Sequence, residues 1–274
     1  MLMQTLHLSE RLRKHLLRLH DREERDLHAE FLAEGVRVCQ ELLRSRIYRA
    51  LLVVLREDAS AEARRLAQAF AQQGVLVYTT SERRFRSLAQ TETPQDILAV
   101  VSYPIEQPAW EDRVLVSDGV SDPGNWGTIV RTAVWFGWRT LVVLPGGVDA
   151  YHPKVVRASA GALFHAFLHR VQRTEEGLQE LERRGYTLIG AEPAAGIPLE
   201  RVRLPRRVAL AVGNEAHGLS EAVRRRCHVL FRIPGAGTLE SLNVGIATAI
   251  ALYHFWQQHH ADAALHTRSG RRSR

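Results

Sequence analysis

The stretch Asp118-Gly-Val-Ser-Asp-Pro-Gly-Asn-Trp-Gly-Thr-Ile-Val-Arg131 places a turn-rich polar loop directly between a strand pattern and a helix pattern. The apolar run 113–117 before it predicts a buried strand, and the spacing of apolar residues over 128–137 predicts a helix. Residues 122–124, Asp-Pro-Gly, form a tight-turn signal, and Asn125 is expected to cap the helix. The polar side chains of this stretch therefore lie at the carboxyl end of a strand, where α/β proteins place their ligand sites.

The alternation of strands and helices continues outward from this stretch in both directions. Towards the C-terminus we expect strands over 140–144, 163–168, 187–191, 208–213 and 229–233, and helices over 153–159, 174–184 and 241–259. Strands separated by helices predict a mostly parallel sheet that is covered on both faces. Towards the N-terminus we expect a smaller α/β unit, with helical patterns over 8–20, 30–43, 60–73 and 81–88 and strands over 48–55, 75–78 and 97–102.

A polar segment over 103–112, which contains two prolines, separates the two units and predicts an extended linker. We place the domain boundary near Gln107. The predicted organisation is an N-terminal domain over 1–107, a C-terminal domain over 108–262 and a basic, disordered tail over 263–274.

The composition is that of a globular protein with a polyanionic partner. The chain has 274 residues, 45% of them hydrophobic, and 37 basic against 30 acidic residues give a net charge of +7. A basic α/β protein whose cations are mostly arginines favours nucleic acid, because guanidinium groups match phosphate geometry. The arginines cluster near the start, around Phe85 and in the tail. The alternative for each cluster alone is a solvated helix face.

Several classes of protein are excluded by the same composition. No apolar run approaches the length of a membrane span and the start lacks the pattern of a signal peptide, so we expect a cytoplasmic protein without membrane contact. Two scattered cysteines, Cys39 and Cys227, predict neither a disulfide framework nor a zinc site, and we expect no metal.

Three polar loops follow predicted strands in the second unit. The first contains Asn125-Trp-Gly-Thr-Ile-Val-Arg131, the second is Val212-Gly-Asn-Glu-Ala-His-Gly-Leu-Ser220, and the third is Arg232-Ile-Pro-Gly-Ala-Gly-Thr-Leu-Glu-Ser-Leu-Asn243. Loops at the carboxyl ends of parallel strands can converge on one crevice. The chain has no Gly-x-Gly-x-x-Gly fingerprint with a following acidic residue, and the third loop matches a phosphate loop poorly, so an ordinary dinucleotide fold is disfavoured.

The order and spacing of these three loops resemble the three motifs of the SpoU-type, TrmH-like branch of the SPOUT RNA methyltransferases. The resemblance covers 113 to about 258, and Phe31-Leu-Ala-Glu-Gly-Val-Arg37 with the unit after it resembles the substrate-binding domain of ribosomal RNA members. The resemblance implies a catalytic α/β domain with a trefoil knot, a smaller L30e-like α/β domain before it, S-adenosyl-L-methionine as cofactor, RNA as partner and a homodimer.

The resemblance also implies the site residues. Catalysis is assigned to Arg131, Asn125, Glu215, Ser241 and Asn243, and Ser241 is in addition a natural cap for the last helix. Because arginine hardly gives up its proton, we expect Arg131 to grip a phosphate and to steer the reacting hydroxyl rather than act as a base. The cofactor is expected to rest on backbone groups in the second and third loops, at Gly213, Asn214, Ile233 and Leu242, with Gly235 and Gly237 permitting close approach.

The predicted function is therefore methylation of a ribose 2′-hydroxyl, with ribosomal RNA favoured by the N-terminal domain. Two alternatives stay open at this point. Transfer RNA is one, because the catalytic motifs alone do not separate the two substrates. A ribosomal RNA-binding or assembly protein that has lost turnover is the other, although the joint presence of the five catalytic residues argues against it.

Overall fold

The computed structural model describes residues 5–89, 94–104, 109–236 and 241–269, with the backbone alone for 260–269. The chain forms two compact units, which are described separately below. Unit 1 comprises 1–108 and 149–166, and unit 2 comprises 109–148 and 167–274. Segment 149–166, which we expected in the C-terminal domain, thus packs with the N-terminal residues. The division of functions between two domains stays a prediction.

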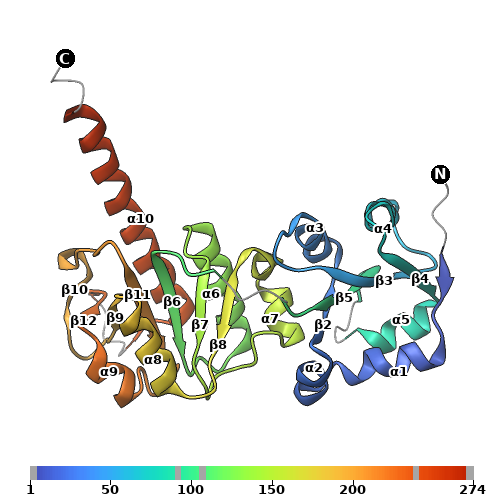
Figure 1. Cartoon of the computed structure of the whole chain (residues 1–274), viewed down its shortest axis with the longest axis horizontal. Coiled ribbons are helices and arrows are strands. Elements are labelled where there is room, and N and C mark those ends of the chain that lie inside the picture. Colours follow the sequence, from blue (N-terminus) through green and yellow to red (C-terminus); the bar gives the residue numbers. More distant parts are fainter. Residues whose placement is uncertain (1–4, 90–93, 105–108, 237–240, 270–274) are drawn as a thin grey trace. The chain divides into compact units, whose positions relative to one another are not determined.

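Unit 1 is built on a mixed five-stranded sheet (Figure 1). The strand order is β1 (Leu6–His7), β4 (Leu76–Thr80), β3 (Ala50–Arg56), β5 (Ile97–Ser102) and β2 (Glu30–Glu34). β1, β4 and β3 are parallel, whereas β5 runs antiparallel to both β3 and β2. One face packs on α1 (Glu10–Arg18) and α5 (Glu82–Leu88), and the other on α3 (Val36–Arg44) and α4 (Ala61–Gln72). The unit also contains α2 (Arg22–His28), α7 (Pro153–Ala158) and the 3₁₀ turn η1 (Ala162–His165).

The helix predicted over 30–43 is wrong in its first third, where the chain forms strand β2. Phe31 to Glu34 are all buried, and together with Glu30 they pair with residues 98–102 of β5. This pairing outweighs the helical spacing of the apolar residues. Gly35 then takes φ +108°, a backbone conformation that residues other than glycine rarely adopt. Helix α3 begins at the next residue, Val36.

Segment 149–166 is held in unit 1 by a buried ion pair and by stacked rings. Arg25, which is 1% exposed, donates through Nη2 to Asp149 Oδ2 at 2.6 Å and through Nη1 to two backbone carbonyls. Tyr151 stacks on Phe31 with ring centroids 4.6 Å apart, and Phe164 lies beside the same ring. These buried contacts explain why the segment leaves its sequence neighbours and packs with β2.

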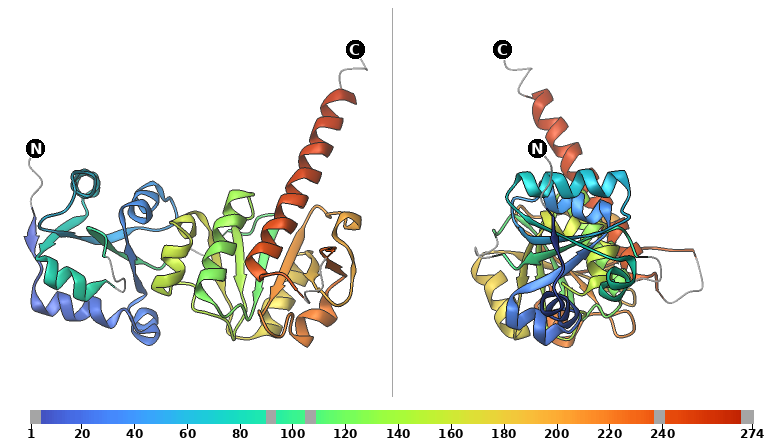
Figure 2. Two further views of the ribbon diagram at one scale, coloured as in Figure 1. Left: turned by 180° about the vertical axis from the view of Figure 1, so that it is seen from behind. Right: turned by 90° about the vertical axis from the view of Figure 1, so that its right-hand side faces the viewer.

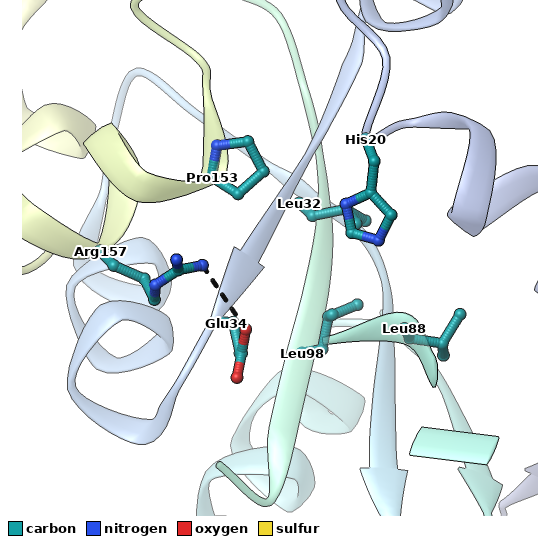
Figure 3. Close-up of a pocket in the computed structure, with 7 residues that line it drawn as sticks. All are labelled: His20, Leu32, Glu34, Leu88, Leu98, Pro153 and Arg157. Carbon is teal, nitrogen blue, oxygen red and sulfur yellow. Dashed lines mark ion pairs between the residues drawn. The ribbon is translucent and has the colours of Figure 1, made fainter. Parts of the chain in front are cut away.

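A small cavity lies in the same unit, between β2, β5 and α7 (Figure 3). Glu34 and Arg157 lie side by side in its lining as an ion pair, with Oε2 and Nη1 3.7 Å apart, and His20 lines the cavity as well. Its volume of about 10 Å³ is that of one water molecule. This cavity is too small for a cofactor, so the candidate site has to lie elsewhere.

Unit 2 is built on a seven-stranded sheet in which every pairing is parallel, as the sequence predicts. The order is β10 (Ile197–Pro198), β12 (Val229–Arg232), β9 (Thr187–Ala191), β11 (Val208–Gly213), β6 (Arg113–Asp118), β7 (Thr140–Val143) and β8 (Phe167–Arg170). Its helices are α6 (Pro123–Trp135), α8 (Thr174–Arg183), α9 (Glu221–Arg226) and α10 (Val244–Ser269), with the 3₁₀ turn η2 (Leu199–Arg201).

Both faces of this sheet are covered, as expected for a parallel sheet. Alternate residues of β6 and β11, such as Val114 and Ala209, pack against Leu178 and Leu181 of α8 and Val223 of α9. The other face carries α6 and α10, which pack on each other, and α10 also contacts β11. The C-terminal part of α10 projects beyond the body of unit 2 (Figure 2).

Three predicted boundaries in or near this unit are corrected. The strand expected over 163–168 begins only at Phe167, because Leu163 and Phe164 are buried in unit 1 as part of η1. The last helix starts at Val244 rather than 241, and it runs to Ser269 although the tail from 263 was expected to be disordered. Within the described residues, no helix combines the length and apolarity needed to cross a membrane.

Candidate active site

The three polar loops singled out in the sequence all leave the sheet of unit 2 at the carboxyl ends of its strands. The first loop follows β6 and leads into α6, the second follows β11, and the third follows β12 and leads into α10. β6 and β11 are neighbours, with Asp118 paired to Gly213 at the very end of both strands. The first two loops therefore start side by side.

The first loop ends in a helix cap that differs from the predicted one. Asp122 is the N-cap of α6, and its Oδ1 accepts a hydrogen bond from the backbone N–H of Asn125 at 2.7 Å. Pro123 follows at the first helical position, which suits its fixed φ and its missing N–H. The expectation that Asn125 caps the helix is therefore wrong, because Asp122 takes that position three residues earlier. As a result the side chain of Asn125 is available for other partners.

Glu215 of the second loop is the centre of the hydrogen-bond network. Its carboxylate accepts from the backbone N–H groups of Ser121 (3.0 Å) and Asp122 (3.1 Å), from Ser121 Oγ (2.7 Å) and from Asn125 Nδ2 (3.0 Å). Burial raises the pKa of Glu215, but these hydrogen bonds outweigh it and lower the pKa to about 2. The carboxylate is therefore ionised at neutral pH, and its oxygens are already occupied by donors.

Asn125 extends this network to the third loop. Its Oδ1 accepts from Asn243 Nδ2 at 2.9 Å, so that Glu215, Asn125 and Asn243 form a continuous chain across all three loops. Asn243 Oδ1 in turn accepts from the backbone N–H groups of Gly245 (2.9 Å) and Ile246 (3.2 Å). Asn243 therefore caps α10, and the expectation that Ser241 does so is wrong.

Asn214 fixes the second loop against the first. Its Nδ2 donates to the carbonyl of Gly119 at 2.9 Å, and its Oδ1 accepts from the backbone N–H groups of Ala216 and His217. Asp118, which is buried, accepts from the backbone N–H of Ser220 at 2.6 Å. Binding of the cofactor by Asn214 stays a prediction, and its hydrogen bonds give it a part in shaping the loop.

Sequence reasoning missed Ser121, Asp118 and Asp122 as parts of the site. Ser121 supplies two of the four hydrogen bonds to Glu215, and Asp118 and Asp122 set the backbone of the first two loops. The available signal was position alone, because all three residues stand at the end of β6 or directly after it. Their partners lie about ninety to a hundred residues away, or in a local cap that competes with Asn125.

Gly213 is required by a close approach of the chain. A Cβ atom at this position would lie 2.2 Å from the carbonyl carbon of Gly218 and 2.4 Å from the nitrogen of Leu219. Gly235 differs, because a Cβ there would meet nothing within 4 Å. Gly237 lies outside the described residues. The role of Gly235 and Gly237 in letting the cofactor approach stays a prediction.

Arg131 and Ser241 are the two predicted catalytic residues that this network does not include. Arg131 lies on the exposed face of α6, and its guanidinium makes no hydrogen bond or ion pair to a described residue. Ser241 is exposed in the third loop, next to Leu242. A cation without a partner among the described residues is suited to binding an anionic ligand.

The second and third loops also offer what a nucleoside-type cofactor needs. Gly213 ends β11, and in the third loop the main-chain groups of Ile233 and Leu242 make no hydrogen bond to any described residue. Main-chain donors and acceptors that are left without protein partners are available to a ligand. The residues present therefore fit S-adenosylmethionine bound mainly by backbone groups, with Gly213, Ile233 and Leu242 as the expected contacts.

The low pKa of Glu215 predicts a pH dependence of stability. Its folded-state pKa of about 2 lies below its usual 4.5, so its contribution is fully present above pH 4.5 and is lost as the pH falls towards 2. Glu215→Gln is therefore expected to lower the melting temperature at about pH 6 and to do so less at about pH 3. Thermal unfolding of both proteins at the two pH values checks this. An equal difference at both would show that ionised Glu215 does not stabilise the fold.

Two family models match the chain. The model of the SpoU rRNA Methylase family matches residues 112–253, which contain all three loops. The model of the MRM3-like substrate binding domain matches residues 13–99, which lie in unit 1.

Individual proteins are similar to nearly the whole chain. The 23S rRNA (guanosine(2553)-2'-O)-methyltransferase RlmP of Bacillus subtilis (strain 168) is 33% identical over 86% of this chain and 92% of its own length. Among solved structures, the SpoU methyltransferase AviRb from Streptomyces viridochromogenes in complex with the cofactor AdoMet has a TM-score of 0.81 and 27% identity, covering 92% of this chain and 100% of that one. The AdoMet-bound rRNA methyltransferase from Sinorhizobium meliloti has a TM-score of 0.80 and 25% identity, covering 93% and 97%.

Proposed function

Because the chain belongs to the SpoU rRNA methylase family, we propose that it transfers a methyl group from S-adenosylmethionine to a ribose 2′-hydroxyl of ribosomal RNA. The observation that carries this proposal is the chain of hydrogen bonds from Glu215 through Asn125 to Asn243. It joins the three loops in a protein that is similar, over most of its length, to a relative named for ribosomal RNA 2′-O-methylation. S-adenosylmethionine, when bound, supplies the methyl group.

The residues of the chain position the acceptor ribose. Arg131 holds a phosphate next to the target nucleotide and thereby steers the hydroxyl towards the methyl group. The hydroxyl oxygen would form a bond to the methyl carbon as the bond between that carbon and the sulfonium sulfur breaks, leaving S-adenosylhomocysteine, and the hydroxyl proton would pass to water. Glu215 is a poor base for that proton, because its pKa is about 2 and its oxygens already accept four hydrogen bonds. Its role is to fix Asn125.

Ser241 and Asn243 approach the substrate from the third loop. Ser241 is exposed and can donate to the ribose or to the cofactor. Asn243 is held by Asn125 on one side and by the first turn of α10 on the other, so its position is set before any ligand binds.

The function is tested by mapping ribose methylation in ribosomal RNA from cells with and without the protein, together with transfer of labelled methyl groups to purified RNA. We expect one ribosomal nucleotide to lose its 2′-O-methyl group when the protein is absent. Incorporation of labelled methyl groups into transfer RNA alone would favour a transfer RNA methyltransferase. Binding of S-adenosylmethionine without incorporation into any RNA would favour a binding or assembly protein.

We further propose that the protein is a homodimer, and an apolar stripe on unit 2 supports this. Ile246, Ile250, Tyr253 and Trp256 follow one another at helical spacing on α10, and all four are exposed, Ile246 to 52%. Helix α6 packs against α10, and its Trp135 is 82% exposed. Large apolar side chains gathered on two packed helices are typical of a surface that another helix pair covers.

The dimer proposal predicts the effect of a charge in this stripe. Ile250→Arg is expected to convert a dimer to a monomer, because an arginine cannot be buried there without a partner. Light scattering after gel filtration gives the mass. Leu27→Arg is the control, since Leu27 of α2 is 73% exposed but lies in unit 1. A monomeric native protein would refute the dimer, and an Ile250→Arg dimer would place the interface elsewhere.

The trefoil knot and the cytoplasmic location also stay proposals. The knot rests on the family resemblance, and part of the third loop, residues 237–240, lies outside the described residues. The cytoplasm is proposed because the relative RlmP is a bacterial protein and ribosomal RNA is modified in the cytoplasm of bacteria.

A further inference from the structure

A wide groove runs along helix α1 on the surface of unit 1. Its volume is about 850 Å³, and its walls come from α1, from the end of α2 and from Tyr78 of β4. The groove is much larger than the buried cavity beside Glu34, and it is open to solvent. It holds six side chains suited to a nucleic acid, namely Arg11, Lys14, His15, Arg18, His28 and Tyr78.

The cations in this groove lie along one face of α1. Arg11, Lys14 and Arg18 are spaced by three and four residues, which places them on a single side of a helix, and all three are exposed. At about 1.5 Å per residue the row is about 10 Å long. Such a row can follow the backbone of an extended polyanion.

The carboxylates near the groove already have partners. Glu10 pairs with Arg13 at 2.6 Å, Glu30 with His15 at 2.7 Å, and Glu24 with both Arg18 and His28. Arg11 and Lys14 make no ion pair with any residue in the described part of the chain. The groove therefore keeps two cations that have no ion-pair partner among the described residues.

Flat rings complete the groove. Tyr78 is half-buried, so its ring is fixed by the sheet while part of it stays accessible. His15 and His28 contact each other edge to face, with centroids 4.7 Å apart. Rings beside a row of cations are the arrangement by which proteins bind single-stranded nucleic acids, since bases stack on the rings while phosphates meet the cations.

Basic charge continues on the neighbouring helix. α5 packs beside α1, where Arg13 Nη1 donates to Ser87 Oγ, and it carries the exposed Arg83 and Arg84. The field of this side of unit 1 is therefore positive beyond the groove itself, which attracts RNA from a distance.

We infer that the groove along α1 binds a single-stranded segment of the substrate RNA, with phosphates on Arg11 and Lys14 and a base stacked on Tyr78. This inference rests on the proposed function for the identity of the RNA. It goes further in assigning one surface of unit 1, and three residues on it, to the contact.

The test measures binding of the full chain to a single-stranded oligouridylate and to a ribosomal RNA transcript by fluorescence anisotropy at several salt concentrations. The double variant Arg11→Ala/Lys14→Ala is expected to weaken binding about ten-fold and to reduce the slope of log Kd against log salt by about 1.4, since each phosphate contact on a single strand contributes about 0.7. Tyr78→Leu is expected to weaken binding about ten-fold, whereas Tyr78→Phe keeps the ring and the affinity.

The matched control is Arg44→Ala/Arg65→Ala. Both arginines are exposed and belong to the same unit, and their replacement removes the same charge as the groove variant. They lie on α3 and α4, which pack on the face of the sheet opposite to α1 (Figure 1). Equal losses of RNA affinity in the two double variants would overturn the inference. So would displacement of the labelled RNA by polyglutamate as effectively as by unlabelled RNA.

The proposed function can fail separately. Binding of S-adenosylmethionine should be unchanged in the groove variants, because the groove and the three loops lie in different units. If the native protein binds RNA through the groove but methylates no RNA, the groove is supported as an RNA-binding site and the proposed methyltransferase activity is refuted. Methylation and RNA binding that the groove variants leave untouched would sustain the activity and refute the groove.

Discussion

Replacing Arg131 by alanine is expected to lower the rate of methyl transfer by about 10²–10³-fold, the range found when one preorganised charged or hydrogen-bonding group is removed from an active site. The guanidinium lies on the exposed face of α6 and has no partner among the described residues, so its removal costs the fold little. Affinity for S-adenosylmethionine is expected to stay the same. Single-turnover transfer of labelled methyl groups to ribosomal RNA, with calorimetry of cofactor binding, measures both.

Lysine at position 131 distinguishes steering of the ribose hydroxyl from simple electrostatic attraction of the phosphate. Arg131→Lys keeps the charge but loses the planar fork that can hold a phosphate through two hydrogen bonds, so an intermediate rate is expected. The control is Arg183→Ala on α8, an exposed arginine paired with Glu180, which should leave the rate unchanged. Full activity and unchanged RNA affinity in Arg131→Lys would mean that Arg131 does not steer the ribose.

Gly213→Ala is expected to lower the free energy of unfolding by about 3 kcal/mol, at the upper end of what overpacking costs. The new Cβ would lie 2.2 Å from the carbonyl carbon of Gly218, and backbone cannot yield as a flexible side chain can. The second loop must move as a whole, and Glu215 moves with it. We therefore also expect affinity for S-adenosylmethionine to fall at least about ten-fold, because a misplaced loop loses its backbone contacts.

The matched change is Gly235→Ala in the third loop. A Cβ there has open space around it and the backbone needs no positive φ. The free energy of unfolding measured in urea should therefore differ from that of the native protein by less than about 0.5 kcal/mol. Equal stability of the Gly213 and Gly235 variants would show that the second loop can shift without cost. A Gly235→Ala protein that is stable but binds the cofactor poorly would support close approach of the ligand at Gly235.

The architecture of unit 2 and the meeting of the three loops at one edge of its sheet were predictable because their signals are local. Each strand is a short apolar run, and each motif loop follows one directly, so the order and spacing of the motifs suffice to place Asn125, Glu215 and Asn243 at one edge of the sheet. What local patterns cannot give is the choice between competing partners. Asp122 and Asn125 are both good caps, but Asp122 takes the cap position and the side chain of Asn125 pairs with Glu215 instead.

Pairings between distant segments account for the remaining differences. Residues 30–34 have the spacing of a helix, yet β5 captures them as a strand. Segment 149–166 follows the sheet of unit 2 in sequence, but Arg25 and Phe31 hold it in unit 1. Ser121 carried no motif signal, because its importance depends on a carboxylate 94 residues away.

The double role of Asn243 has a consequence for how the protein matures on the ribosome. This one side chain starts the last helix and also reaches Asn125, which is 118 residues earlier in the chain. A nascent chain that has not yet emerged as far as residue 243 can form β6, α6 and β11, but it leaves Asn125 bound on one side only. Contacts between such distant residues form late, since the intervening chain must be ordered first. We therefore expect competence for catalysis to require synthesis of α10, because a chain that ends before this helix would hold only two of the three loops.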